Sequence, residues 1–271
     1  MRELVVRKVT GLALVQDLGR VGLAAQGVPR GGALDRAALA RANAAAGNDP
    51  GSAAIEIIGR LVVSAESELV VATERGDRQA LPAGAEITIE PDPLRRVRYL
   101  AVAGGIDVPV VLGSRSTLAV AGLGGHEGRA LRAGDRLETS TPPTRPEGRV
   151  SMLTRLQGPI RVVPGPDDEA LGSAALESLM GRAWRLDPQS DRSGTRLSGS
   201  PIARSLLGDT LPSSPMVVGA IQLPAAGMPI VLGPDGPTTG GYPLIGVIAS
   251  ADLDRFHALP LGAEVRFALF S

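Results

Sequence analysis

The chain of 271 residues is 44% hydrophobic but only 2% aromatic, and its 28 basic residues balance its 28 acidic residues. This hydrophobic content excludes a disordered chain and requires a core built mainly from Val, Leu, Ile and Ala. The balanced charge and scarce aromatic residues argue against electrostatic capture of nucleic acid, base stacking and attraction to an anionic membrane.

Missing residue types narrow the chemistry further. The absence of cysteine excludes thiol nucleophiles, disulfides and thiolate metal sites. Two histidines, His126 and His257, are too few for a His-rich metal site, so we predict no metal. Lys8 is the only lysine, and its strand-like surroundings match neither a biotin-attachment site nor a Schiff-base site. If biotin takes part, another chain must carry it.

The distribution of apolar residues indicates the cellular location of the protein. No apolar run approaches the ~20 residues of a membrane span. Met1-Arg-Glu-Leu-Val-Val enters a strand-like pattern at once and lacks the apolar region of a signal peptide. We therefore expect a cytoplasmic protein with no nucleic-acid or membrane partner.

Short apolar segments bounded by Gly and Pro predict a β-rich fold. The expected strands are residues 61–63, 68–72, 86–89, 97–102, 160–163, 219–223, 230–232 and 263–270. A Leu-x-x-Gly motif occurs at residues 81–84, 131–134 and 259–262, each time just before an alternating apolar pattern. Each copy predicts a glycine turn that leads directly into a strand.

Three segments are expected to be helical. Residues 35–46 are rich in alanine, with Asp35 as the N-cap and Gly47 just past the end. A second helix opens at Pro166-Asp-Asp-Glu and runs to about residue 180, with acidic residues where the helix dipole favours them. The third covers residues 252–259, with Ser250 as its expected cap.

The best candidate for a linker is the Pro-rich stretch at residues 139–148. It divides the chain into residues 1–148 and residues 149–271, each large enough for its own core. The pattern leaves open whether strands cross between these halves.

Several dense motifs follow one another along the chain. In the first half they include Val15-Gln-Asp-Leu-Gly-Arg20, Gly27-Val-Pro-Arg-Gly-Gly-Ala-Leu-Asp35, Ala101-Val-Ala-Gly-Gly-Ile-Asp107 and Leu112-Gly-Ser-Arg115-Ser-Thr117. In the second half they include Pro164-Gly-Pro166, Ser190-Asp-Arg-Ser-Gly194, Gly219-Ala-Ile-Gln222 and Thr238-Thr-Gly-Gly-Tyr-Pro243. In this order, from about residue 15 to residue 267, they resemble the biotin-dependent carboxyltransferase family. That family includes the C-type component of 5-oxoprolinase, the KipA-like proteins and the part of urea carboxylase known in older records as allophanate hydrolase subunit 2.

The resemblance implies a mainly β fold of two cyclophilin-like β-barrel units, residues 1–148 and 149–271, with a few short helices. It implies an enzyme subunit, inactive alone, of an ATP-dependent hydrolase that opens the cyclic amide 5-oxoproline to glutamate. The implied partners are a B-type (KipI-like) subunit and an A-type 5-oxoprolinase subunit, with ATP used through the complex.

Two alternative functions stay open beside this one. The chain could be a carboxyltransferase component that takes its carboxyl group from carboxybiotin carried on another chain, as in urea carboxylase. It could also be a non-enzymatic regulatory protein that binds a KipI-like partner.

The chain departs from the family pattern at three places, one of which is a shorter stretch before Leu81-Pro-Ala-Gly84. Thr73-Glu-Arg-Gly-Asp77 stands where relatives often have Thr-Gly-Ala-Asp. Ser193-Gly-Thr195 follows Ser190-Asp-Arg, where the family commonly has Met-Gly-Tyr. These departures bear on the substrate rather than on the fold.

In the first half of the chain, three candidate site residues follow directly after an apolar, strand-like segment. Gln16, Asp17 and Arg20 could present an amide, a carboxylate and a guanidinium to one ligand. Alternatively, the segment forms an Asx-turn closed by Gly19, with Arg20 solvated. We take Asp17 as a catalytic candidate, and Gln16 and Arg20 as substrate-binding candidates.

Arg115 and Ser116 lie in a polar loop suited to a carboxylate or phosphoryl oxygen, although Arg115 could equally tie loops together. Arg115 is a second catalytic candidate, and Ser116 is a substrate-binding one. Asn43, a further substrate-binding candidate, interrupts the alanine helix and either points at a ligand or holds a neighbouring loop. Glu56 alternates with two isoleucines, so we expect it to be solvated.

In the second half, the third catalytic candidate is Asp191, which could act as a base beside Arg192 as an anion clamp, or the two could pair with neighbours across a turn. Two glycines in residues 238–242 would let backbone N–H groups approach an anion, with hydroxyls nearby as further donors. The substrate-binding candidates of this half are Arg192, Gln222, Thr238, Thr239, Gly240, Gly241 and Tyr242. We expect His257 to be exposed, and we assign no catalytic role to His126.

Overall fold

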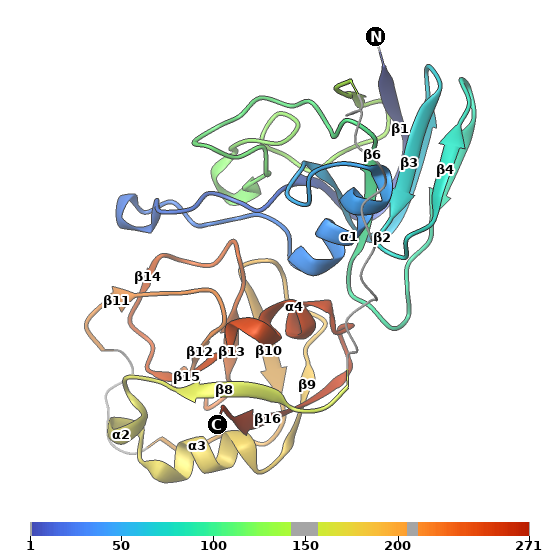
Figure 1. The fold of residues 1–271 in the computed structure, drawn as a ribbon. Helices are drawn as coiled ribbons and strands as arrows, with labels where there is room; N and C mark the ends of the chain where they lie inside the picture. Colours follow the sequence, from blue (N-terminus) through green and yellow to red (C-terminus); the bar gives the residue numbers. More distant parts are fainter. Residues whose placement is uncertain (1, 142–156, 205–210, 271) are drawn as a thin grey trace. The chain divides into compact units, whose positions relative to one another are not determined.

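The computed structural model describes residues 2–141, 157–204 and 211–270 (Figure 1). The chain forms two compact units. Among the described residues, unit 1 comprises residues 2–21 and 30–141, and unit 2 comprises residues 22–29, 157–204 and 211–270. The boundary predicted near residue 148, with most of the expected linker, lies outside the described residues. The sequence did not predict that residues 22–29 belong to unit 2.

Unit 1 is built on a long antiparallel hairpin, β1 (Glu3–Gln16) and β2 (Ala54–Ala65), which pairs from Leu4↔Ala65 to Gln16↔Ala54. The sheet order is β4-β3-β6-β2-β1-β7, with β5 also paired to β2. The remaining strands are β3 (Leu69–Thr73), β4 (Arg78–Leu81), β5 (Glu86–Ile89), β6 (Arg98–Val102) and β7 (Arg136–Glu138). A short 3₁₀ turn, η2 (Ala119–Ala121), lies in the loop before β7.

Helix α1 (Arg36–Ala46) packs on β3 and β6 of this sheet. The predicted caps are confirmed: Asp35 Oδ1 accepts the Ala38 N–H at 2.8 Å, and Gly47 ends the helix in the left-handed conformation. The small alanine side chains of α1 let the helix pack closely on the sheet, and they share a core with Leu39 and Tyr99. The opposite face of the sheet forms a larger aliphatic core that includes Ile55, Ile57 and Leu100.

Unit 2 is a closed barrel with the strand order β10-β13-β12-β15-β8-β16-β9. Its strands are β8 (Ile160–Pro164), β9 (Ala183–Leu186), β10 (Gly194–Ser198), β12 (Ala220–Gln222), β13 (Ile230–Leu232), β15 (Leu244–Ile248) and β16 (Glu264–Leu269). A two-stranded ribbon, β11 (Ser214–Pro215) and β14 (Thr239–Gly240), and a 3₁₀ turn, η1 (Ala24–Gln26), complete the unit. The mainly β prediction is confirmed, although the sheet of unit 1 curls without closing.

Two helix predictions for unit 2 need correction. The expected second helix is interrupted at Gly172, whose φ of 85° separates α2 (Asp168–Leu171) from α3 (Ser173–Met180). Helix α4 (Ser250–Ala258) includes Ser250 as its first residue, so Ser250 is not its cap. Ala249 holds the cap position and supplies no side-chain hydrogen bond.

The three Leu-x-x-Gly motifs form the same turn. Gly84, Gly134 and Gly262 all have φ between 79° and 96°, and β5, β7 and β16 begin two residues later. Each glycine N–H donates a hydrogen bond of 2.7–2.8 Å to a backbone carbonyl of another strand. The acceptors are Ala65 for Gly84, Val6 for Gly134 and Leu186 for Gly262. The prediction of glycine turns leading into strands is confirmed.

Each predicted strand coincides with an observed one, and the described strands pair only within their own unit. Short strands without a strong apolar pattern, such as β4, β11 and β14, were not predicted. Within the described ranges, no helix combines the length and the apolar character that a membrane span requires.

Candidate functional site

Asp17, just after β1, connects two loops of unit 1 through its carboxylate. Its Oδ1 accepts the Gly19 N–H at 2.8 Å and the Ser114 hydroxyl at 2.6 Å, and its Oδ2 accepts the Arg115 N–H at 2.6 Å. The Asx-turn considered for this motif is therefore present, but the expectation of a solvated Arg20 that went with it is wrong, because Arg20 is buried. The same carboxylate also fixes the loop around Ser114, about a hundred residues further along the chain.

Arg20 lies in the same cluster and is 2% exposed. Its guanidinium donates to the Val111 carbonyl at 3.1 Å, the Ser116 hydroxyl at 3.0 Å and the Ser116 carbonyl at 2.8 Å. Gly124 passes so close that a Cβ there would collide with the guanidinium and with Ser116. Arg20 and Ser116 thus hold each other and the glycine-rich loop in place.

Gln16 ends β1 next to this cluster and is fully buried. Its side-chain amide donates to the Thr117 carbonyl at 3.1 Å. Its Oε1 is buried and accepts no hydrogen bond from any group in the described parts of the chain. The structure therefore brings five predicted residues together: Gln16, Asp17, Arg20, Arg115 and Ser116.

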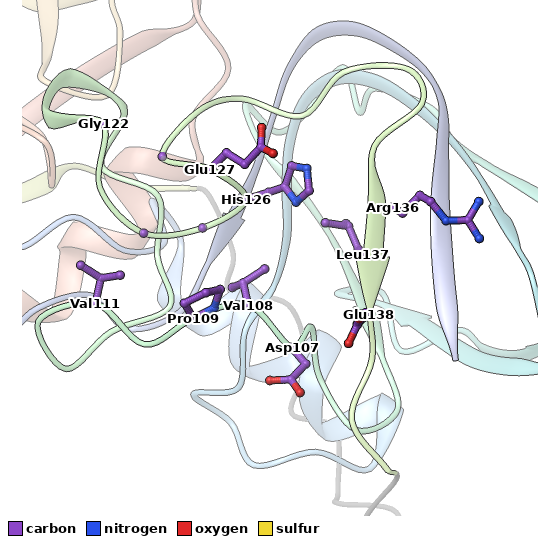
Figure 2. Close-up of a pocket in the computed structure, with 13 residues that line it drawn as sticks. Asp107, Val108, Pro109, Val111, Gly122, His126, Glu127, Arg136, Leu137 and Glu138 are labelled. Atoms are coloured by element: carbon purple, nitrogen blue, oxygen red, sulfur yellow. The ribbon is translucent and has the colours of Figure 1, made fainter. Parts of the chain in front are cut away.

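A cleft of about 470 Å³ borders this cluster (Figure 2). Its walls come from residues 107–111, the loop 122–128 and β7. Arg115 supports one wall, because its guanidinium contacts the Val108 carbonyl and lies 3.1 Å from Asp107 Oδ1. Asp107 and Glu138 lie at one end of the cleft (Figure 2), where the Asp107 N–H donates to the Glu138 carbonyl at 2.8 Å.

His126 and Glu127 stand at the other end of this cleft (Figure 2). His126 Nε2 lies 3.5 Å from Asp135 Oδ1, and Arg129 forms a bidentate ion pair with Asp135. The hydrogen bond from Arg129 holds the pKa of the Asp135 carboxyl below its ordinary value. Carboxylates outnumber cations along this cleft, so it is poorly suited to an anionic ligand.

Asn43 lies apart from these residues, on the last turns of α1. Its side-chain amide donates to the Ser52 carbonyl at 2.7 Å, and its Oδ1 accepts from Asn48 Nδ2 at 3.1 Å. Asn48 in turn donates to the Val102 carbonyl at 2.8 Å. Asn43 is fully buried and joins the end of the helix to the following loop.

The expectation that Glu56 is solvated is wrong. Glu56 is 1% exposed, and its Oε2 accepts the Leu34 N–H at 2.8 Å and the Tyr99 hydroxyl at 2.6 Å. Its side chain does point away from Ile55 and Ile57, but that face of the sheet is covered by α1 and the loop before it. Burial, together with the negative charge of Glu56, raises the pKa of Tyr99 well above its ordinary value.

The expectation that His257 is exposed is also wrong. His257 is 3% exposed on α4, and its ring packs edge-on against Phe256 with centroids 5.4 Å apart. The helix is short and docks against the barrel, so more of its surface is covered than its polar sequence indicates.

In unit 2, Arg192 and Asp191 occupy one tight turn before β10. Arg192 forms a bidentate ion pair with Asp235, and both side chains are nearly fully buried. Asp191 Oδ1 accepts the N–H groups of Ser193 and Gly194 at 2.8 and 3.1 Å. Asp191 therefore bonds within its own turn, whereas the ion pair of Arg192 is with a residue 43 positions away and not with a neighbour across the turn.

A pocket of about 210 Å³ in unit 2 contains two of the predicted residues, Asp191 and Gln222. It lies over the outward-facing residues of β10, β13 and β12, while Leu197, Val231 and Ile221 on the same strands point into the barrel core. Its other lining residues are Gln189, Ser193, Gly194, Arg196, Ile230, Leu232 and Pro237.

The loop that carries Thr238–Tyr242 borders Gln222. Thr239 and Gly240 form β14, and a Cβ at Gly240 would lie 2.8 Å from Gln222 Nε2. The Thr238 carbonyl accepts the Met216 N–H at 2.9 Å, and the Gly241 carbonyl accepts from Leu211 at 2.6 Å. Tyr242 is 42% exposed. The predicted residues of unit 2 therefore gather around one side of the barrel.

Sequence reasoning missed Arg196, Gln189 and Ser193 as residues of this pocket. The alternation in Thr195-Arg-Leu197 was the available signal, because it turns Arg196 outward from a strand whose neighbours face the core. The pairing of that strand with β13 and the position of Pro237 could not be read from the sequence.

Comparison with known proteins identifies the family. A sequence model of the carboxyltransferase domain, subdomains A and B, matches residues 26–269. The chain is 38% identical to the C-type component of 5-oxoprolinase from Escherichia coli, across 93% of this chain and 86% of that protein. The chain belongs to the carboxyltransferase domain family.

Two solved structures share the fold over 99% of this chain. The crystal structure of TTHA0988 is 28% identical with a TM-score of 0.86, and this chain spans 56% of its length. The urea amidolyase of K. lactis is 26% identical with a TM-score of 0.84, and this chain spans 19% of it. In both, the region that resembles this chain is part of a longer polypeptide.

Proposed function

We propose that this chain is the C-type component of an ATP-dependent 5-oxoprolinase, a hydrolase that opens 5-oxoproline to glutamate. The observation that carries the proposal is the 38% identity, along nearly the whole chain, to the 5-oxoprolinase component of Escherichia coli. That relative is named as a subunit, which supports a role within an assembly. We place that assembly in the cytoplasm.

The proposed substrate is a small, planar cyclic amide with a carboxylate. Opening it requires donors for the carbonyl oxygen, on which negative charge develops, and a cation for the carboxylate. In unit 2 Gly240 lies against Gln222, which lines a pocket of about 210 Å³, and residues 238–241 follow Pro237, which also lines it. We assign this region to substrate binding and Asp191 to proton transfer. In unit 1, Asp17 and Arg115 are proposed to act by shaping the loops around the larger cleft.

The proposed assembly contains a B-type (KipI-like) subunit and an A-type one, and we assign ATP use to the complex as a whole. The pocket of unit 2 is below the several hundred Å³ typical of sites for larger cofactors. The side chain of Lys8, the only lysine, projects from the middle of strand β1 and lacks the context of a biotin carrier. Any biotin is therefore proposed to be carried by a partner.

A second candidate function is supported by the likeness to the K. lactis urea amidolyase. In that case the chain would receive the carboxyl group from carboxybiotin on another chain and transfer it to an amide-like acceptor. A third candidate, a regulatory protein that binds a KipI-like partner, needs no catalytic residue in this chain.

One experiment separates these candidates. The chain is combined with its A-type and B-type partners, and ATP-dependent release of glutamate from 5-oxoproline is measured beside carboxylation of urea with a biotin-carrying partner. We expect glutamate release only, reduced by Arg115→Ala and by Thr239→Ala in folded protein. Carboxylation of urea alone would favour the second candidate, and neither activity in an assembled complex would favour the third.

A further inference from the structure

Three strands of the unit 2 barrel place a guanidinium, an aliphatic side chain and an amide in one row. Arg196 on β10 is paired with Ile230 on β13, and Ile230 is paired on its other side with Gln222 on β12. All three line the same pocket. Because adjacent strands lie about 4.8 Å apart, the Arg196 and Gln222 backbones are separated by about 10 Å, with Ile230 between them.

The polar ends of this row are available to a ligand. Across the described part of the chain, no acceptor pairs with the Arg196 guanidinium, and the residue is exposed at the pocket. Gln222 is 5% exposed, and its amide nitrogen lies 3.5 Å from the Met216 sulfur. None of the described groups donates to its carbonyl oxygen. A cation and a hydrogen-bond acceptor thus flank an apolar surface formed by Ile230, Leu232 and Pro237.

The geometry points to a site for a small cyclic amide that carries a carboxylate, with Arg196 as the residue that binds the carboxylate. Its planar fork matches a carboxylate in a bidentate way. The oxygen of Gln222 can accept the amide N–H, and the ring carbons can pack on Ile230. The choice of 5-oxoproline among such molecules rests on the proposed function.

Asp191 is the one carboxylate among the described residues that line this pocket, and its Oδ1 already accepts two backbone N–H groups. These bonds offset part of its negative charge, so it opposes an anionic ligand less than an unpaired carboxylate would. The cleft of unit 1 differs, because Asp107, Glu127 and Glu138 all line it. The carboxylate-bearing ligand is therefore assigned to unit 2.

The test measures binding of 5-oxoproline to the full-length chain by calorimetry or ligand-observed NMR. Arg196→Gln is compared with Arg185→Gln, a matched variant of an exposed arginine on the neighbouring strand β9 that does not line the pocket. 2-Pyrrolidinone serves as the same ring without the carboxylate. We expect Arg196→Gln to weaken 5-oxoproline binding by roughly 10- to 100-fold, the loss of a charged hydrogen-bonded pair. Arg185→Gln should leave it unchanged, and 2-pyrrolidinone should bind equally to all three proteins.

Arg196→Lys adds a check on the bidentate geometry, since it keeps the charge and loses the fork; we expect an intermediate affinity. Equal affinity of wild type and Arg196→Gln, or no binding to wild type at millimolar concentration, would overturn the assignment. In the assembled enzyme we expect Arg196→Gln to raise KM for 5-oxoproline. An unchanged KM would overturn the site while leaving the proposed function standing. Binding without any turnover in the complete assembly would leave the site standing and overturn the proposed function.

Discussion

Arg192 and Asp235 form a buried bidentate ion pair, with Nε 2.8 Å from Oδ2 and Nη2 2.9 Å from Oδ1. The pair joins the turn before β10 to the loop after β13. A guanidinium already neutralised in this way is poorly placed to bind a substrate anion as well. Arg192 therefore supports the pocket whose anion-binding side chain we assign to Arg196.

Replacing Arg192 should destabilise the chain strongly. Arg192→Met leaves the Asp235 carboxylate buried without its cation, which typically costs about 3–5 kcal/mol of unfolding free energy. The double variant Arg192→Met/Asp235→Leu should recover much of that loss, because no buried charge remains unpaired. Urea unfolding of both variants, with Arg185→Met as the exposed control, checks this. A loss below about 1 kcal/mol in the single variant would contradict the role of the pair.

Arg20 is expected to be a structural residue of unit 1. Arg20→Ala removes the hydrogen bonds to the Val111 and Ser116 carbonyls and should cost about 2–4 kcal/mol. Arg20→Lys should recover little, because an ammonium cannot reproduce the planar set of donors. Arg60→Ala, at an exposed position on β2, is the control and should change unfolding by less than about 0.5 kcal/mol. Full stability of Arg20→Lys would contradict this role.

The ion pairs of Asp252 predict a pH dependence of stability. The hydrogen bond from Arg161, with further help from Arg255, holds the pKa of Asp252 well below its ordinary value. A depressed pKa in the folded state stabilises the fold above the unfolded-state pKa near 3.9 and loses that effect as pH falls through the folded-state pKa. Asp252→Asn should therefore be less stable than wild type at pH 7, and the gap should shrink below about pH 4. Glu264→Gln serves as an exposed control, and a gap that stays constant down to about pH 2 would contradict the assignment.

The Tyr99 hydroxyl should resist ionisation as long as the protein is folded. Its pKa is raised by burial and by Glu56, so the phenol stays protonated in the folded state at pH values where it would ionise in the unfolded chain. Stability should consequently fall as pH rises above about 10. Tyr99 and Tyr242 are the two tyrosines of the sequence. In Tyr242→Phe, ultraviolet titration should show tyrosinate only when the protein unfolds, and a reversible titration near pH 10 in folded protein would argue against this burial.

The features that could be predicted from the sequence are those set by residues close together in the chain. Asp35 and Gly47 set the ends of α1, and the Leu-x-x-Gly motifs set the starts of three strands, because these signals act within a few residues. Gln16, Asp17 and Arg20 lie together because they are neighbours in the chain, whereas Asn43 lies apart on α1.

Long-range packing decided the rest. Glu56 alternates as a solvated strand residue would, yet the face to which it points is covered by α1 from another part of the chain. Arg196 lies in the pocket because β13 runs beside β10, a pairing that a single sequence does not specify. The partner of Arg192 is likewise 43 residues away. Such contacts depend on topology, and no periodicity or turn signal encodes them.

The most direct test of the proposed role is an omission experiment on 5-oxoproline hydrolysis. ATP-dependent glutamate release is measured with this chain alone, with the A-type and B-type partners alone, and with all three together. We expect turnover only in the complete mixture. Turnover by this chain alone, or equal turnover when it is left out, would contradict its role as an essential part of the enzyme.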